Sequence, residues 1–190
     1  MLAAALDEFK PLAQYYSSLT TNEGNNPFTE CATEGDDWKG KGYSFQSPWH
    51  FINLPYYDEE GTDASDFPDF DQGDVDVVQA MTDLYGFLKG TVTASESTYV
   101  SQIADKFSYE EDQRSFAIRL FIHYSGDVHQ PLHATALVDS HYTHGDEGGN
   151  YEHIPSQDGV SNLHSVWDSM IYQYTGYPDL VSKGNHQSLI

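Results

Sequence analysis

The sequence predicts a mainly α-helical protein that folds as one domain over residues 1–190. The chain has 190 residues, of which 38% are hydrophobic, and this is enough to form a single core. Two segments, residues 75–89 and 108–128, carry apolar side chains at helical spacing. The segments around them are rich in glycine, proline and polar residues, which indicates long loops.

The first helix is expected to begin near Pro11, because proline is tolerated in the first turn of a helix. Residues 21–35 are predicted to form a loop. Residues 53–74 contain two prolines, two glycines and many acids, and they indicate a long surface loop. The stretch D-F-D-Q-G-D at 69–74 lacks the glycine and the glutamate that an EF-hand needs at its sixth and twelfth positions. A solvated acidic loop is therefore favoured there.

The segment 75–89 has its apolar side chains on one helical face, at Val77, Met81, Leu84 and Leu88. Asp74 is the expected N-cap of this helix and Gly90 its stop signal. Residues 134–160 are expected to form a loop with a short hairpin. A last helix is predicted over 163–174, ended by Gly176 and Pro178.

The central helix is predicted from Ser108 to about Val128, and two acids near its start suit the positive end of a helix. Its apolar stripe runs through Phe116 and Leu120 and continues into His123 and Asp127. A histidine and an acid that face a core need a partner, because an unpaired buried charge is unfavourable. A metal ion would be such a partner.

Two H-x-x-x-D pairs, His123/Asp127 and His164/Asp168, place an imidazole and a carboxylate one helical turn apart. Zinc accepts both ligand types at about 2.0–2.2 Å. With nine histidines in the chain, one such pair alone is as easily explained by chance.

The stretch Q-P-L-H, residues 130–133, follows the central helix. A residue before proline avoids the α region, so the helix is expected to end near His129. His133 would then point in another direction from His123 and suit a second metal. The alternative is that Q-P-L-H is only a helix stop.

Composition restricts the possible binding partners, cross-links and membrane segments of this chain. The net charge of −22 repels nucleic acid unless a local positive site overrides it. The single cysteine, Cys31, excludes an intramolecular disulfide and is not a zinc site by itself. No apolar run is long enough for a membrane span, and the start M-L-A-A-A-L-D lacks the basic region of a signal peptide.

Several motifs together resemble the zinc-dependent S1/P1 nuclease family. They are H-Y-S-G-D-V-H-Q-P-L-H (123–133) with the following D-x-G-G-N (146–150), N-L-H-S-V-W-D (162–168), W-H-F-I-N-L-P (49–55) and D-D-W-K (36–39). Their order and spacing match the family from about residue 32 to residue 172. The resemblance implies a mainly helical fold of the type shared with phospholipase C, with long loops and three zinc ions in a cleft.

The resemblance also implies a set of metal ligands. The first zinc would be held by Asp36, His50, His123 and Asp127, and the second by His133, His164 and Asp168. Asp36 is preferred to Asp37 because Lys39 then lies three residues later, where the family often has a basic residue. Asp127 would bridge to a third zinc, whose ligands in the family are an N-terminal tryptophan and a nearby histidine.

Catalysis and substrate binding follow from the same resemblance. Asp36 would orient a water and accept its proton, while zinc and Lys39 would stabilise charge on the phosphoryl oxygens. The products would be 5′-phosphorylated fragments of single-stranded RNA and DNA, with 3′-nucleotidase activity as well. Phe51 and Asn53 lie where the family contacts a nucleobase, although Phe51 is equally well explained as a core aromatic.

Three further residues are expected outside the ligand set. His129 lies six residues after His123, on another helical face, and is expected to hydrogen-bond to a ligand carboxylate. Asp146 and Asn150 are expected to order the loop over the site or to contact a group behind the ligands.

Some family features are missing from this sequence. The chain has no tryptophan before Trp38 and no histidine before His50, so the third zinc site lacks its usual ligands. The chain therefore resembles a family member that is incomplete at both its N- and C-termini. The family is secreted or lysosomal/vacuolar, which the resemblance extends to this chain.

Three functions remain open on the sequence. The first is a zinc endonuclease that acts on single-stranded nucleic acid or nucleotides, with no protein partner implied. The second is a zinc-dependent phospholipase C, against which the base-contacting positions Phe51 and Asn53 argue. The third is a non-catalytic zinc-binding protein that lacks the third zinc site.

Overall fold

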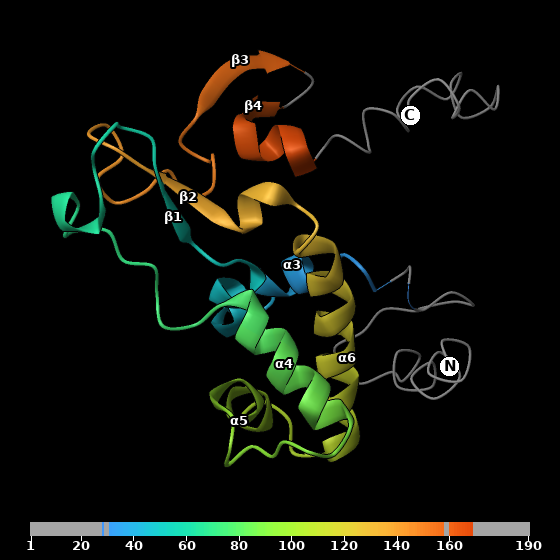
Figure 1. Cartoon of the computed structure of the whole chain (residues 1–190). Coiled ribbons are helices and arrows are strands. Elements are labelled where there is room, and N and C mark those ends of the chain that lie inside the picture. The colour runs from blue at the N-terminus through green and yellow to red at the C-terminus, as the bar shows by residue number, and fades with distance from the viewer. Residues whose placement is uncertain (1–27, 29–30, 158–159, 169–190) are drawn as a thin grey trace, which may run out of the picture. The chain divides into compact units, whose positions relative to one another are not determined.

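A computed structural model describes residue 28 and residues 31–157 and 160–168. The chain divides into two compact units. The first unit comprises Met1–Ile52 and Gly73–His129, and the second comprises Asn53–Gln72 and Gln130–Ile190. Among the described residues, the longer α-helices lie in the first unit, whereas the strands and the helical residues 163–168 lie in the second (Figure 1). The protein is mainly α-helical, as the sequence predicted, whereas the prediction of a single domain stays a prediction.

The long helix of the first unit is α6, Glu110–Asp127, close to the predicted range. Three acids occupy its first turn, where the backbone N–H groups favour negative charge. Phe116, Leu120 and His123 are buried along one face, which confirms the predicted stripe. The helix thus carries a histidine into the interior of the unit.

Helix α4, Val77–Leu88, packs against α6 and against α5, Thr98–Ala104 (Figure 1). The predicted helix is confirmed, but the predicted cap is wrong. The N-cap is Asp76, whose carboxylate accepts a hydrogen bond from the backbone N–H of Gln79 at 2.9 Å. Asp74 lies three residues before the first helical residue, too early to reach that donor. Helix α5 was not predicted from the sequence.

Two short elements of the first unit were also not predicted. They are α3, Glu34–Lys39, and the 3-10 helix η1, Ser44–His50, so the predicted loop 21–35 is wrong at its last two residues. Trp38 of α3 stacks on Phe116 of α6 with ring centroids 4.4 Å apart. A buried ion pair of 2.7 Å joins Arg119 of α6 to Glu34 of α3. These contacts hold α3 against α6.

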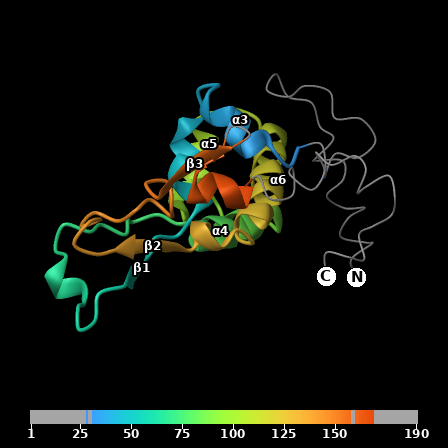
Figure 2. The same ribbon diagram turned by 90° about the horizontal axis from the view of Figure 1, so that it is seen from above.

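The second unit contains a two-stranded parallel sheet. Strand β1, Leu54–Tyr57, pairs with β2, Thr135–Val138, and the two lie side by side in both views (Figures 1 and 2). The surface loop predicted for 53–74 is therefore wrong over β1, as is the loop 134–160 over β2. The rest of 53–74 contains the short 3-10 helix η2, Ala64–Asp66.

A short hairpin is present, but it extends past the predicted range 134–160: β3, His153–Gln157, pairs antiparallel with β4, Val160–Asn162. Residues 163–168 are helical, as predicted. The remainder of that predicted helix, and the one predicted to begin near Pro11, lie outside the described residues. In the described part of the chain no helix combines the length and apolar character that crossing a membrane requires.

Candidate metal centres

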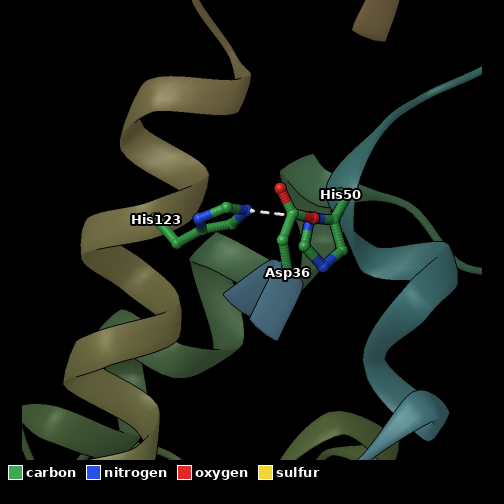
Figure 3. A group of neighbouring side chains, drawn as sticks. All are labelled: Asp36, His50 and His123. Atoms are coloured by element: carbon green, nitrogen blue, oxygen red, sulfur yellow. Dashed lines mark hydrogen bonds and ion pairs between the residues drawn. The ribbon is translucent and has the colours of Figure 1, made fainter. Parts of the chain in front are cut away.

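Three elements of the first unit each contribute one side chain to a cluster of possible metal ligands. Asp36 comes from α3, His50 from η1 and His123 from α6 (Figure 3). Nδ1 of His50 lies 3.1 Å from Nε2 of His123, and both nitrogens lie 3.7 Å from Oδ1 of Asp36. The structure thus brings together three residues that are 14 to 87 positions apart in the sequence.

Asp127 is the fourth member of this first centre. Its Oδ2 lies 2.9 Å from Nδ1 of His50 and 3.3 Å from Nε2 of His123. The five measured separations among the four ligand atoms therefore run from 2.9 to 3.7 Å. A tetrahedral ion with bonds of 2.0–2.1 Å sets its ligand atoms about 3.3 Å apart. The four atoms fit around one ion of this kind.

Hydrogen bonds behind the histidines determine which ring nitrogens face the centre as acceptors. Nδ1 of His123 lies 2.6 Å from the carbonyl oxygen of Ala32, which can only accept, so this nitrogen carries the proton. Nε2 of His50 faces the side-chain oxygen of Gln46 in the same way. In the neutral rings, His50 Nδ1 and His123 Nε2 therefore present lone pairs to the two carboxylates. Four acceptor atoms that converge without a proton need a positive charge between them, from a bound cation or from a second proton on a ring.

The charges of the first centre agree with this requirement. Burial alone would raise the pKa of Asp127, but when the rings of His123 and His50 are protonated, their hydrogen bonds and charge hold that pKa well below its usual range. Burial lowers the pKa of His50, against the opposing effect of Asp127. Burial acts the same way on His123, but there Asp127 outweighs it and the pKa is raised. The carboxylate is thus ionised where a cation would bind.

Asp36 is the open side of the first centre. Its side chain is 63% exposed, whereas those of His50, His123 and Asp127 are 2%, 7% and 12% exposed. Lys39 donates a hydrogen bond to Oδ1 of Asp36 at 2.7 Å. Partial burial raises the pKa of Asp36, but the hydrogen bond and charge of Lys39 outweigh that effect, and the pKa is lowered. Of the two adjacent acids, it is Asp36 that faces the histidines, in agreement with the sequence-based choice over Asp37.

Gly35 contributes to the first centre through its lack of a side chain, which the sequence analysis missed. A Cβ atom at this position would lie 2.5 Å from Cδ2 of His123, with the nearby ring carbon at 2.6 Å. The imidazole therefore packs directly on the backbone of α3. A glycine inside a helix is unfavourable by about 1 kcal/mol relative to alanine, and that signal could have marked the position.

The second unit holds a second cluster, formed by His133, His164 and Asp168, whose ligand atoms lie within 4.8 Å of one another. Nε2 of His164 is 3.4 Å from Oδ2 of Asp168, one helical turn later. The ring of His133 lies parallel to that of His164, with centroids 5.0 Å apart. The three residues predicted for the second zinc are therefore neighbours.

The chain reaches His133 through the break that Pro131 introduces. Helix α6 ends at Asp127, and Gln130 has the extended backbone expected before proline, with φ −87° and ψ 114°. A short 3-10 helix, η3 (Pro131–His133), follows. The side chain of Gln130 accepts from the N–H of Leu132 at 2.6 Å and donates to Oδ1 of Asp168 at 3.1 Å. Gln130 thus orients a candidate ligand, a role that the sequence did not reveal.

The D-x-G-G-N segment orders the loop behind the second centre. Buried Asp146 accepts from the N–H groups of Leu137 and Gly149, both at 2.8 Å. The carbonyl of Gly148 accepts from Nδ1 of His164 at 2.8 Å, which leaves Nε2 of that ring as a free acceptor. Gly148 has φ +59°, and a Cβ there would overlap the carbonyl oxygen of Leu132. Asp146 thus links both ends of its own loop, and its role at the site stays a prediction.

The remaining predicted residues have other contacts. Asn150 donates to the carbonyl of Glu147 at 2.9 Å, within the same loop. Nδ1 of His129 lies 2.6 Å from the carbonyl of Ser125, so the carboxylate partner expected for His129 is not the one observed. Phe51 and Asn53 are both half-buried. Phe51 is not a member of the buried apolar cluster among the described residues, which speaks against a core aromatic.

Comparison with known proteins identifies the family of this chain. The family model of the S1/P1 nuclease matches residues 7–183. The chain belongs to the S1/P1 nuclease family. Three similar relatives are from Arabidopsis thaliana. Endonuclease 5 is 47% identical over 55 residues, Endonuclease 3 is 34% identical over 89, and Endonuclease 2 is 26% identical over 131.

These matches cover 29%, 43% and 69% of this chain. They cover 16%, 27% and 39% of the respective relatives, so the chain spans less than half the length of the S1/P1 nuclease relatives that it matches. The segment 7–183 that matches the family model includes both candidate metal centres.

Proposed function

We propose that this S1/P1 nuclease family member is a zinc-dependent hydrolase that cleaves phosphodiester bonds in single-stranded RNA and DNA. The observation that carries the proposal is the first centre, where two imidazole lone pairs and two carboxylates converge at separations suited to one zinc ion. His133, His164 and Asp168 are proposed to hold a second zinc. The names of the relatives, all endonucleases, support the reaction class.

Zinc bound in these centres would supply Lewis acidity and a lowered pKa for water. Asp36, the exposed member of the first centre, is proposed to orient the attacking water and to accept its proton. The ammonium of Lys39, 2.7 Å from the same carboxylate, is proposed to stabilise charge on the phosphoryl oxygens. The products would be 5′-phosphorylated, and 3′-nucleotides would lose their phosphate.

The substrate is proposed to be single-stranded because the surface opposes a long duplex. A net charge of −22 repels a polyanion overall, and bound cations would offset that charge locally. Phe51 would stack on an unpaired base and Asn53 would hydrogen-bond to it. Secretion or a vacuolar location is proposed from the family resemblance alone.

The test is hydrolysis of single-stranded RNA and DNA by the purified chain, with and without a zinc chelator. We expect chelation to abolish cleavage and added zinc to restore it, with 5′-phosphate ends on the products. His123→Ala should lower the rate by at least about 100-fold, more than loss of an outer partner does. The matched control is His141→Ala, which removes an exposed histidine of the second unit and should retain the rate.

Two other outcomes would point to different functions. Hydrolysis of phosphatidylcholine in place of nucleic acid would identify a phospholipase C. Tight zinc binding without hydrolysis of either substrate would identify a non-catalytic zinc protein. Either result would overturn the nuclease proposal.

A further inference from the structure

Gln46 is a buried polar residue that lies behind the first centre and is not one of its ligands. Its side chain is completely buried in η1, four residues before His50. Its side chain contacts Gly35 of α3, His50 of η1 and Tyr124 of α6, and all three partners belong to the first unit. We propose that Gln46 is a positioning residue that selects the ring tautomer of His50 and thereby prepares Nδ1 to bind zinc.

The orientation of the Gln46 amide follows from its partners. One end of the amide lies 2.7 Å from the carbonyl oxygen of Gly35, which has no proton to give. That end must be the NH₂ group, because the reversed amide would place two acceptors in contact. The other end, Oε1, then faces the hydroxyl of Tyr124 at 2.8 Å and Nε2 of His50.

The amide orientation determines the tautomer of His50. Oε1 is an acceptor only, so Nε2 of His50 must donate to it and carry the ring proton. Nδ1 is then unprotonated and points at Asp127 and His123, 2.9 and 3.1 Å away. In the opposite tautomer, two lone pairs would meet at Gln46, and a proton would occupy the place of the metal. Gln46 therefore favours the form that can bind zinc.

The network also joins the parts of the first centre. Gly35 precedes the candidate ligand Asp36 in α3, Gln46 and His50 lie in η1, and Tyr124 follows the candidate ligand His123 in α6. Tyr124 is itself fully buried. A single amide thus connects the three elements that supply the ligands in Figure 3.

Loss of the Gln46 amide should move the ring proton of His50 from Nε2 to Nδ1. In Gln46→Met, a side chain of similar length offers only a weakly accepting sulfur. The proton on Nε2 of His50 would then be buried without a good acceptor, whereas a proton on Nδ1 would find Asp127 at 2.9 Å. The penalty for an unsatisfied buried donor is large enough to shift the tautomer ratio by about tenfold or more.

The primary measurement is the tautomer of His50 in the metal-free protein, read by long-range ¹H–¹⁵N correlation at a pH where the ring is neutral. We expect the Nε2-protonated form in the wild type and in Gln46→Glu, which keeps an acceptor at this position. We expect the Nδ1-protonated form in Gln46→Met. An Nδ1-protonated ring in the wild type would overturn the inference, and this result does not depend on the folding of any variant.

Zinc affinity provides a second readout, measured by competition with a chromophoric chelator. Because it concerns a zinc ligand, the inference rests on the proposed zinc site. Gln46→Met should weaken the first centre by about 10–100-fold while the second centre serves as an internal reference. Gln46→Glu keeps the acceptor for Nε2 of His50 but loses the donor to the carbonyl of Gly35, so it should weaken the first centre by less than Gln46→Met does. Tyr124→Phe is the matched control, because it leaves the contact of Gln46 with His50 intact, and its zinc affinity should remain within about threefold of the wild type.

Failure of this inference and failure of the nuclease proposal give different results. Equal tautomer and equal zinc affinity in the wild type and Gln46→Met would overturn the role of Gln46, even if nucleic acid is cleaved. An Nδ1-protonated ring in Gln46→Glu would also overturn it, because an acceptor at this position would then not determine the tautomer of His50. Conversely, the expected tautomers and affinities without cleavage of nucleic acid would support Gln46 and overturn the nuclease proposal.

Discussion

At the scale of single residues, both centres orient a histidine through a hydrogen bond to a backbone carbonyl. In each, a backbone carbonyl accepts from Nδ1 of a histidine, Ala32 for His123 and Gly148 for His164, and so leaves Nε2 free for a metal. A glycine lies at or near each carbonyl: Gly35 is three residues after Ala32, and Gly148 supplies the second carbonyl itself. A Cβ atom at either glycine would overlap a neighbouring atom. The geometry of the ligands therefore depends on glycines that bind nothing themselves.

Gly35→Ala should disturb the first centre. The new methyl group would lie 2.5 Å from Cδ2 of His123, so the imidazole or α3 must move. A shift of this size breaks the alignment of a ligand, and we expect zinc affinity at the first centre to fall by at least about tenfold. Calorimetric zinc titration would measure the change.

The matched control is Gly40→Ala, at the C-cap of the same helix. Gly40 has φ −77°, and the nearest atom to an added Cβ is 3.9 Å away. This variant should bind zinc as the wild type does. If both variants bind zinc equally well, the ring of His123 has more freedom than its packing on Gly35 indicates.

The sequence predicted the candidate ligands better than the residues that support them. The spacing of His123 and Asp127 on a helical face, and the break at Pro131, follow from local geometry that a sequence displays. The roles of Gln46 and Gln130 depend on partners 78 and 38 residues away, Tyr124 and Asp168. No periodicity or local motif records such contacts.

At the scale of elements, the long helices were predictable and the short ones were not. α4 and α6 span 12 and 18 residues, long enough to show the helical repeat of apolar side chains. α3 has only six residues, and β1 has four with a proline among them. β1 also pairs with a strand 81 residues later, and parallel pairing at this distance leaves no turn signal to find.

The cap of α4 gives a prediction at this scale. Asp76→Ala removes the carboxylate that accepts from Gln79 N–H and should lower the free energy of unfolding by about 1 kcal/mol. Asp74→Ala, at the exposed position first taken as the cap, should change it by less than about 0.5 kcal/mol. Urea denaturation of both variants would measure the difference. A larger loss in Asp74→Ala would mean that the helix begins earlier than it does here.

At the scale of the whole molecule, metal ions should contribute to stability. Each unit contains one cluster of carboxylates and imidazoles whose ligand atoms lie close enough to bind one cation. Binding to the folded state alone stabilises by about 4 kcal/mol per site when zinc exceeds its dissociation constant a thousandfold. Chelation should therefore lower the unfolding temperature, and zinc should restore it.

Calorimetry with and without chelator would measure this effect, and magnesium provides the control. Magnesium prefers an all-oxygen environment and should not restore stability at centres built from imidazoles. An unfolding temperature that chelation leaves unchanged would contradict the proposed zinc sites.

His123→Ala should reduce the zinc content from two ions to one, because the second centre belongs to the other unit.

The net charge of −22 leads to the last prediction, which concerns the proposed nuclease activity. A polyanionic substrate must approach an acidic surface to reach the cations, and salt shortens the range of that repulsion from about 30 Å at 0.01 M to about 8 Å at 0.15 M. We therefore expect kcat/KM for a single-stranded oligonucleotide to rise severalfold over this range, at constant free zinc. A 3′-mononucleotide carries far less charge and should respond less. A steep fall with salt, as basic nucleic-acid-binding proteins show, would mean that the substrate follows a local positive path that the overall charge does not reveal.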